Sequence, residues 1–219
     1  MPHPKGGYRN KAGKKVPSVT TITNRFKDSG GLLWWAFEQG KAAERGEIES
    51  LYDKRDEAAE AGKLAHALAE AYLKGKKLPD IPDDKIGEQA RQGFKNFIRW
   101  FSMSKLEVAY TEVELVSEEY QYGGCNDLVF QSDLGLAIGD IKTSGGIYVG
   151  YLVQIAAYAH LWNEKHPEAP LTGGFHLCRF SKEDADFAHH FWTDLSDAWE
   201  MFKLLRKAYD LDKKLKKRI

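Results

Sequence analysis

The spacing of apolar side chains changes near residue 105, from a helical period to the short runs typical of strands. Before that point, apolar residues recur three or four positions apart, and glycine or proline closes the runs. This pattern predicts helices over residues 32–45, 56–74 and 84–103. Ser18 or Thr20 can cap a further helix that begins the folded part.

The second half of the chain alternates predicted strands with predicted helices. Turn residues separate its apolar runs, which predicts strands over residues 106–116, 120–130, 136–143, 174–180 and 187–193. Helical spacing predicts helices over residues 151–164 and from residue 195 to the C-terminus. A chain with this order is predicted to form an α/β fold, a mixed sheet flanked by helices with an N-terminal helical part.

The length of 219 residues suits one domain. Residues 1–16 are polar, basic and rich in glycine and proline, so we expect them to form a flexible basic arm. Residues 17–219 are then expected to form a single domain. Within it, residues 17–105 are predicted to be the mainly helical part and residues 106–219 the α/β core.

Charge is distributed unevenly, although the formal net charge is zero. Residues 1–15 hold five basic residues and no acidic one, and residues 210–219 hold five basic against two acidic residues. The remaining residues, 16–209, hold 22 basic and 30 acidic residues, a net charge of −8. The basic ends can bind phosphates, or they can be solvated tails that only aid solubility.

Several classes of protein are excluded by what the sequence lacks. Cys125 and Cys178 are too few for a disulfide framework, a cysteine-only zinc site or an iron–sulfur cluster. No apolar run follows the charged N-terminus, as a secretory signal requires, and no run approaches the ~20 apolar residues of a membrane span. We therefore expect a cytoplasmic protein without a membrane partner.

The segment around Asp127 and Asp140 carries the strongest candidate chemistry. A hairpin turn centred on Asp133 and Leu134 places these two carboxylates opposite each other, about 5 Å apart. Side chains alternate along a strand, so Lys142 shares a face with Asp140. Two such carboxylates repel each other unless a cation lies between them, and oxygen ligands suit Mg²⁺ or Mn²⁺. The alternative is a structural Asp–Lys ion pair.

Two predicted helices add candidate ligands. Gln154 and Tyr158 are four positions apart and share a face, where they can hold a phosphate or an attacking water. His66 and Glu70 share one stripe of an earlier helix with Gly62, and neutral imidazole is a common metal ligand. Taken alone, the first pair also fits an ordinary amphipathic helix, and His66 also fits a surface pair with Glu70.

Other residues fit binding roles but fit structural roles at least as well. Three aromatic residues can stack bases or lie in the core: Trp34, Trp35 and Phe94. Three histidines lack cysteines at the spacing of a zinc site and are interpreted as strand and surface residues: His176, His189 and His190.

Four motifs follow one another along the chain: Gly62-x-x-x-His66-x-x-x-Glu70, Gly124-x-x-Asp127, Asp140-x-Lys142 and Gln154-x-x-x-Tyr158. Together they resemble the PD-(D/E)XK nuclease superfamily, in its RecB-like exonuclease branch. The openings of phage and mitochondrial members are also similar to residues 17–22 and to Trp35-Ala36, and Glu112 ahead of Ser117 fits the same pattern. The resemblance covers about residues 17–193.

The resemblance implies a restriction-endonuclease-like core that carries a metal-dependent nuclease site. It implies one or two Mg²⁺ or Mn²⁺ ions held by His66, Asp127, Asp140 and the Ile141 carbonyl. It implies a catalytic set of Asp127, Asp140, Lys142, Gln154 and Tyr158. Three further residues are interpreted as supporting the ligands or contacting substrate at the edge of the site: Glu70, Glu112 and Thr143.

The sequence departs from the family pattern at two positions outside the central chemistry. Cys125 follows Gly124 where a small residue such as threonine is usual, and Lys63 stands where a small hydroxyl residue is common. The cluster-bearing relatives need four cysteines, so no iron–sulfur cluster is expected. This points to the compact phage or mitochondrial genome maintenance exonuclease type.

The resemblance implies a DNA exonuclease that acts on single-stranded ends in phage-type DNA recombination, repair or degradation. The implied partners are DNA with a free end and phage or host recombination proteins, in the host cytoplasm if the chain is phage-encoded. Three alternatives stay open: a structure-specific endonuclease with the same site, a non-catalytic DNA-binding module of the same fold, and an unrelated α/β protein. The sequence leaves open the polarity of digestion, DNA against RNA, the number of ions and the oligomeric state.

Overall fold

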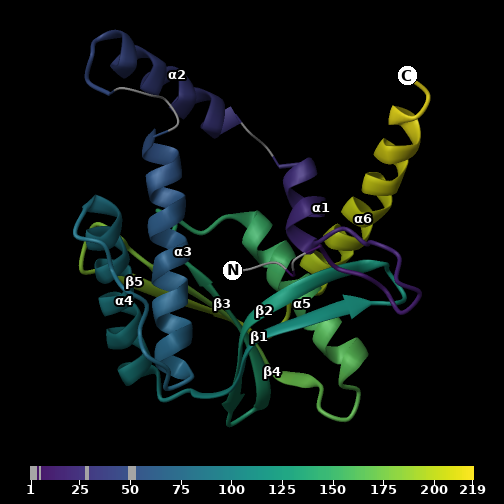
Figure 1. The fold of residues 1–219 in the computed structure, drawn as a ribbon. Helices are drawn as coiled ribbons and strands as arrows, with labels where there is room; N and C mark the ends of the chain where they lie inside the picture. The colour runs from purple at the N-terminus through teal and green to yellow at the C-terminus, as the bar shows by residue number, and fades with distance from the viewer. Residues whose placement is uncertain (1–3, 5, 28–29, 49–52) are drawn as a thin grey trace.

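A computed structural model describes residues 4, 6–27, 30–48 and 53–219, and Figure 1 shows their arrangement. Five strands form one mixed sheet in the order β1-β2-β3-β4-β5. The strands are β1 (Glu107–Ser117), β2 (Tyr122–Ser132), β3 (Gly135–Lys142), β4 (Leu171–Phe180) and β5 (Phe187–Trp192). The helices are α1 (Val19–Arg25), α2 (Gly30–Glu44), α3 (Asp53–Leu73), α4 (Lys85–Ser104), α5 (Val149–Lys165) and α6 (Ser196–Lys216).

The predicted fold class is confirmed, since helices flank a mixed sheet as in a restriction-endonuclease-like core. The strands β1, β2 and β3 form an antiparallel meander, and β4 pairs parallel to β3 and antiparallel to β5. The parallel pair needs a crossover, and α5 supplies it. The predicted start of β4 was three residues late, because Gly173 and Gly174 interrupt the apolar run while the backbone continues as a strand from Leu171.

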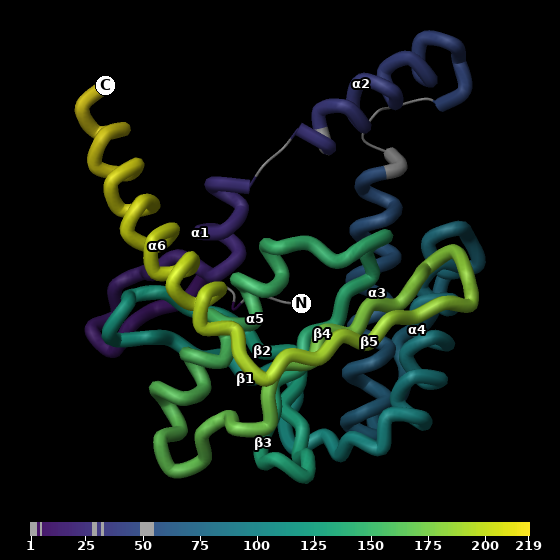
Figure 2. The backbone as a smooth tube through the Cα atoms, turned by 180° about the vertical axis from the view of Figure 1, so that it is seen from behind, coloured from purple at the N-terminus to yellow at the C-terminus, as the bar shows by residue number. Residues whose placement is uncertain are grey.

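Two apolar cores lie on the two sides of the sheet. One joins α1, α5 and α6 to the strands and includes Ile22, Tyr122, Ile155 and Phe202, all fully buried. The other joins the sheet to α3 and α4, where Phe97 and its neighbours pack against strand residues. Figure 2 shows the two helical layers from behind, with α5 and α6 apart from α3 and α4.

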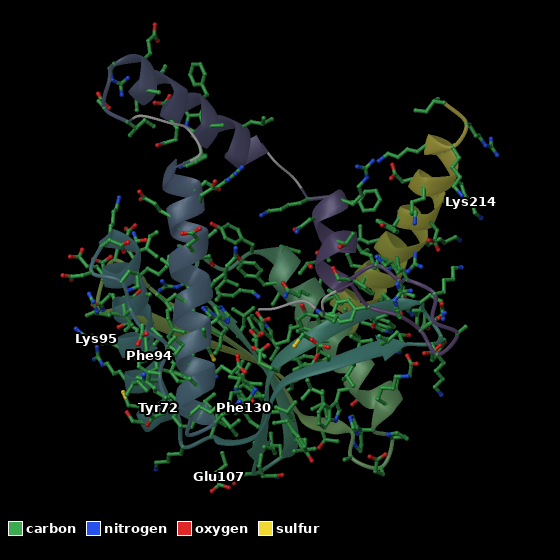
Figure 3. All side chains as sticks on the ribbon, in the orientation of Figure 1. Tyr72, Phe94, Lys95, Glu107, Phe130 and Lys214 are labelled. Carbon is green, nitrogen blue, oxygen red and sulfur yellow. The ribbon has the colours of Figure 1, made fainter. Side chains whose placement is uncertain are left out.

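The pairing of α3 with α4 follows from the aromatic stripe seen in the sequence. Figure 3 shows Tyr72 of α3 beside Phe94 of α4, and their ring centroids lie 6.1 Å apart in an edge-to-face arrangement. Phe97 stacks on Phe101 at 5.8 Å and meets the edge of Phe180 on β4 at 5.7 Å. This packing fixes α3, which carries His66, against the sheet.

The N-terminal segment is anchored over its described part rather than loose. Tyr8 is 4% exposed, and its carbonyl accepts a hydrogen bond from the Val16 amide at 3.0 Å. Gly123 of β2 donates its amide to the Pro17 carbonyl at 3.0 Å, and the Thr21 amide donates to the Ser18 hydroxyl that caps α1. Of the two capping candidates, Ser18 therefore takes the role.

Within the described ranges, no helix combines the length and the apolar character needed to cross a membrane.

Candidate active site

The β2–β3 hairpin brings two aspartates together. The strand ladder joins Leu128 to Gly139, and Asp127 and Asp140 come next on their strands, so they lie opposite each other as the turn position predicts. The Ile141 amide donates a hydrogen bond to Asp127 Oδ2 at 2.8 Å. This bond uses one oxygen of Asp127 to fix the carboxylate between the strands.

The two carboxylates are buried and incompletely paired. Asp127 is 3% exposed and Asp140 is 1% exposed. Among the residues that the structure describes, Asp127 Oδ1 and Asp140 Oδ1 have no hydrogen-bond partner. Burial, and then the charge of Asp140, hold the pKa of Asp127 well above its ordinary value, and burial also raises the pKa of Asp140. A cation between the two oxygens would relieve both effects.

Lys142 supplies one positive charge to this pair. Its Nζ lies 2.5 Å from Asp140 Oδ2 and 4.9 Å from the centre of the Tyr151 ring. Burial lowers the pKa of Lys142, but the charges of Asp140 and Asp127 oppose this effect and leave the pKa raised. Lys142 is therefore an ammonium ion in this arrangement.

Tyr151 is a further residue beside the acidic pair, and the sequence motifs do not include it. It lies on α5 three positions before Gln154 and seven before Tyr158, so the three side chains share one face of the helix. Its ring contacts the Lys142 ammonium. The spacing on α5 is the signal that could have found it.

Gln154 and Tyr158 are buried beside the acidic pair. Gln154 Nε2 donates a hydrogen bond to Tyr158 Oη at 3.0 Å. Burial, followed by the charges of Asp140 and Asp127, raises the pKa of Tyr158 well above its ordinary value. A Cβ at Gly124 would lie 2.5 Å from Tyr158 Cε1, so the glycine of this motif makes room for the tyrosine ring.

Helix α3 also contacts the site, through Gly62 and His66. A Cβ at Gly62 would lie 2.8 Å from Thr143 Oγ1, so this glycine allows α3 to approach the end of β3. His66, one turn later, lines a small cavity together with Asp127 and Ile141. Burial, and then the charge of Lys142, lower the pKa of His66 to about 3. The imidazole is therefore neutral at pH 7, which is the form that binds metals.

Two glutamates line the same cavity. Glu70 is paired with Lys74, at 2.6 Å between Oε1 and Nζ, rather than with His66. Glu112 accepts a hydrogen bond from Cys125 Sγ at 3.3 Å, and burial raises its pKa.

The backbone at Glu112 is unusual. Its φ of 52° lies in the left-handed region, inside a strand. The neighbouring pairs join Thr111 to Leu128 and Val113 to Asn126, so Glu112 lies opposite Asp127 but outside the ladder. Such strain persists only where the surroundings hold it, and it is concentrated at functional sites. No pattern in the sequence indicates this conformation.

These residues fit an oxygen-preferring divalent cation in part. Two buried carboxylate oxygens have no partner in the described part of the chain, and His66 and Ile141 border the same cavity as Asp127. Over residues 6–27, 30–48 and 53–219, no three His, Cys, Asp or Glu side chains are grouped so that they could hold a metal ion. An ion at this site therefore needs other ligands as well, such as the Ile141 carbonyl, water or a phosphate oxygen.

The other candidates of the sequence lie elsewhere. His176 Nδ1 lies 2.8 Å from His189 Nε2 between β4 and β5, which agrees with their interpretation as strand residues. Phe94 packs in the core between α3 and α4. Trp34 of α2 is 65% exposed, with Phe37 5.8 Å away, so it is free of the core.

Comparisons with known proteins give distant structural likeness alone. No family model matches the chain, and no curated protein matches it. A solved structure named "Putative exonuclease", from Eubacterium rectale, has 14% sequence identity and a TM-score of 0.47, over 68% of each chain. The structure of SSO0001 has 13% identity and a TM-score of 0.32, over 68% of this chain and 73% of that one. At these values neither likeness bears on function.

Proposed function

We propose that this protein is a divalent-metal-dependent nuclease that hydrolyses phosphodiester bonds of DNA. One observation carries the proposal: two buried aspartates, Asp127 and Asp140, face each other with oxygens that have no partner among the described residues, and the ammonium of Lys142 lies against Asp140. Two carboxylates and one lysine leave a buried excess of negative charge.

A structural ion pair accounts for this arrangement poorly. An Asp140–Lys142 pair needs no second carboxylate, and burying Asp127 beside it adds repulsion and desolvation. Such a cost is characteristic of sites that bind a cation or carry out chemistry. The neutral imidazole of His66 and the strained Glu112 on the same cavity support this interpretation.

In the proposed reaction, the metal ion and the protein side chains have different roles. Bound Mg²⁺ or Mn²⁺ supplies Lewis-acid activation and neutralises phosphate charge. Asp127, Asp140, His66 and the Ile141 carbonyl are proposed to hold it. The Lys142 ammonium, fixed beside Asp140, stabilises negative charge that develops on the phosphate and orients the attacking water.

Gln154 and Tyr158 on α5 are proposed to position the substrate. The Tyr158 hydroxyl oxygen accepts a hydrogen bond from the Gln154 amide, so the hydroxyl proton is still available to donate to a substrate. These groups are fixed by burial, so they can orient a phosphate oxygen or the attacking water without reorganising. We further propose that the enzyme is an exonuclease for single-stranded ends that takes part in DNA recombination, repair or degradation.

Digestion of matched linear and circular DNA tests the proposal. The same labelled single strand is supplied linear and covalently closed, with Mg²⁺, with Mn²⁺ or with EDTA. Lys142→Met removes the ammonium and keeps most of the side-chain volume. Lys95→Met is the matched control, because Lys95 is exposed on α4. We expect metal-dependent loss of the linear strand alone, abolished by Lys142→Met and unchanged by Lys95→Met.

Each other outcome has a distinct meaning. Cleavage of the circle, with the same dependence on Lys142 and metal, keeps the nuclease and replaces the exonuclease with an endonuclease. Cleavage of RNA in preference to DNA changes the substrate. No cleavage of single-stranded, duplex or flap substrates, with DNA binding retained, supports the non-catalytic module and contradicts the proposal.

A further inference from the structure

Residues 14–17 and helix α6 meet at a second pocket, apart from the acidic site. It has a volume of about 240 Å³. The N-terminal segment contributes Lys14 and Lys15, the β1–β2 turn contributes Gln121, and α6 contributes Arg206 and Lys213. Figure 1 shows the N-terminal segment and α6 side by side at the same end of β1 and β2, and Figure 2 shows the same from behind.

The pocket holds more positive charge than its surroundings neutralise. Arg206 is paired with Asp210, and it also donates to the backbone carbonyls of Tyr120 and Gln121 at 3.0 and 3.2 Å. In the part of the chain that the structure describes, Lys14, Lys15 and Lys213 have no ion-pair partner. Three ammonium groups around one pocket repel each other, and an anion in the pocket would reverse this effect.

The backbone that carries Lys14 and Lys15 is held in place. The Lys14 amide donates to Asn10 Oδ1 at 2.9 Å, and Lys15 forms a β-bridge with Arg9. Asn10 Nδ2 in turn donates to Gln121 Oε1 at 2.7 Å, which ties this segment to the β1–β2 turn. The backbone of the two lysines is therefore held in place before a ligand arrives, unlike that of lysines on a solvated tail.

The pocket lies within reach of the acidic site along β2. Gln121 and Asp127 are six residues apart, which corresponds to about 20 Å of extended strand. At the ~3.4 Å per nucleotide of one strand along a duplex axis, that span corresponds to about six nucleotides, and it corresponds to fewer in an extended single strand. One nucleic-acid strand can therefore occupy both places.

We infer that Lys14, Lys15 and Lys213 form a phosphate-binding pocket that holds the backbone of a DNA strand while its end lies at Asp127 and Asp140. That the ligand is DNA rests on the proposed nuclease function. Where it binds rests on the geometry of the pocket itself. The inference assigns a joint role to the two basic chain ends, which the sequence left open between phosphate binding and solubility.

A measurement of DNA binding under conditions that prevent cleavage tests the inference separately from catalysis. Fluorescence anisotropy measures the affinity of a labelled single strand of about twelve nucleotides, in EDTA and over a series of salt concentrations. One variant carries Lys14→Gln, Lys15→Gln and Lys213→Gln. The matched control carries Lys76→Gln, Lys77→Gln and Lys95→Gln, three exposed lysines that have no ion pair among the described residues and lie outside the pocket.

The pocket variant is expected to bind at least about tenfold more weakly at low salt. The slope of log affinity against log salt should fall in magnitude by about two, because each phosphate contact on a single strand contributes about 0.7. The control has the same net charge and should keep both values close to those of the wild-type protein. Circular dichroism checks that both variants are folded.

Equal losses in the two variants would show that general charge, not the pocket, binds DNA, and would overturn the inference. So would unchanged affinity in the pocket variant, or no binding by the wild-type protein. A different outcome is that the protein does not bind the DNA strand but binds vesicles containing phosphatidylserine through the same three lysines. This would assign the pocket to an anionic lipid surface instead. A wild-type protein that binds through the pocket but never cleaves would contradict the proposed function and leave this inference standing.

Discussion

At the scale of single residues, the balance between burial and charge defines the site. Asp127 and Asp140 are almost completely enclosed, yet within the described part of the chain only one oxygen of Asp127 accepts a backbone hydrogen bond and only Lys142 forms an ion pair with them. The backbone hydrogen bond that holds Asp127 is one that a neutral asparagine can also accept, whereas Asp140 is held by the charge of Lys142. The charge of Asp127 is therefore separable from the fold by isosteric substitution.

Asp127→Asn should abolish cleavage and stabilise the metal-free protein. The asparagine oxygen can still accept the Ile141 amide, while the repulsion with Asp140 is removed. We expect a gain of about 1 kcal/mol, because active sites sacrifice stability for function. This corresponds to about 2–4 °C in Tm for a protein of this size. Thermal unfolding in EDTA measures it.

Asp133→Asn is the control for this substitution, because Asp133 is exposed in the β2–β3 turn. It should leave both cleavage and Tm close to the wild-type values. A lower Tm for Asp127→Asn, with cleavage retained, would show that the carboxylate has a structural role.

His176 is a second buried group whose charge opposes folding. Burial, and then the charge of His189, lower its pKa from 6.5 to about 4. Between these two values the unfolded chain binds a proton at His176 that the folded protein does not. The contribution of this residue to stability is therefore present above pH 6.5 and is lost as the pH falls from 6.5 to about 4.

His176→Phe should make stability fall less steeply in this range. Phenylalanine can keep the packing against Phe130 and Phe191, and the exposed His189 can bond to water instead. Urea unfolding at several pH values between 4 and 7 measures the difference from the wild-type protein. His190→Gln leaves His176 in place and should follow the wild-type curve. Parallel curves for His176→Phe and the wild-type protein would contradict the assignment.

At the scale of secondary structure, glycines set how closely the elements approach. Gly124 allows the Tyr158 ring of α5 to lie on β2, and Gly62 allows α3 to reach Thr143 at the end of β3. Both glycines belong to motifs that also carry site residues. The spacing within each motif therefore reflects packing between elements as well as chemistry.

Gly124→Ala should destabilise the protein by about 1–3 kcal/mol, since its Cβ would overlap the Tyr158 ring and crowd Leu161. Displacing the ring also breaks the Gln154–Tyr158 hydrogen bond, so activity should fall with stability. Gly150→Ala is the matched control in α5, where a Cβ meets nothing within 4 Å. It should be neutral or stabilise by up to about 1 kcal/mol. Equal unfolding free energies for the two variants would refute the packing argument.

At the scale of the whole molecule, the site joins parts that are distant in the chain. His66 comes from the helical half, Asp127 and Asp140 from the meander, and Tyr158 from the crossover helix. The second pocket likewise joins residues 14–17 to α6. Any ligand that binds to residues from several elements must stabilise the fold as a unit.

Divalent metal should therefore raise the Tm of the wild-type protein. At a concentration of Mg²⁺ or Mn²⁺ about 100 times the Kd, the gain is about 2.7 kcal/mol, or several degrees. Differential scanning fluorimetry with and without EDTA measures this shift. Asp127→Asn should abolish it and Asp133→Asn should keep it. An equal shift in Asp127→Asn would place the ion elsewhere.

The sequence determined the elements and the hairpin at the centre of the site. Apolar periodicity is local, so α3 to α6 and all five strands could be predicted to within a few residues of their ends. The turn at Asp133 and Leu134 fixed the register of β2 and β3, and with it the facing positions of Asp127 and Asp140. These features depend on neighbours that are close in the chain.

Only the tertiary structure decided which distant residues meet. The left-handed Glu112 opposite Asp127, the Tyr151 ring beside Lys142 and the anchored N-terminal segment depend on contacts between elements far apart in sequence. The basic composition of the two chain ends is visible in the sequence. Their convergence on one pocket is not, because it follows from how α6 packs against α1, α5 and the β1–β2 turn.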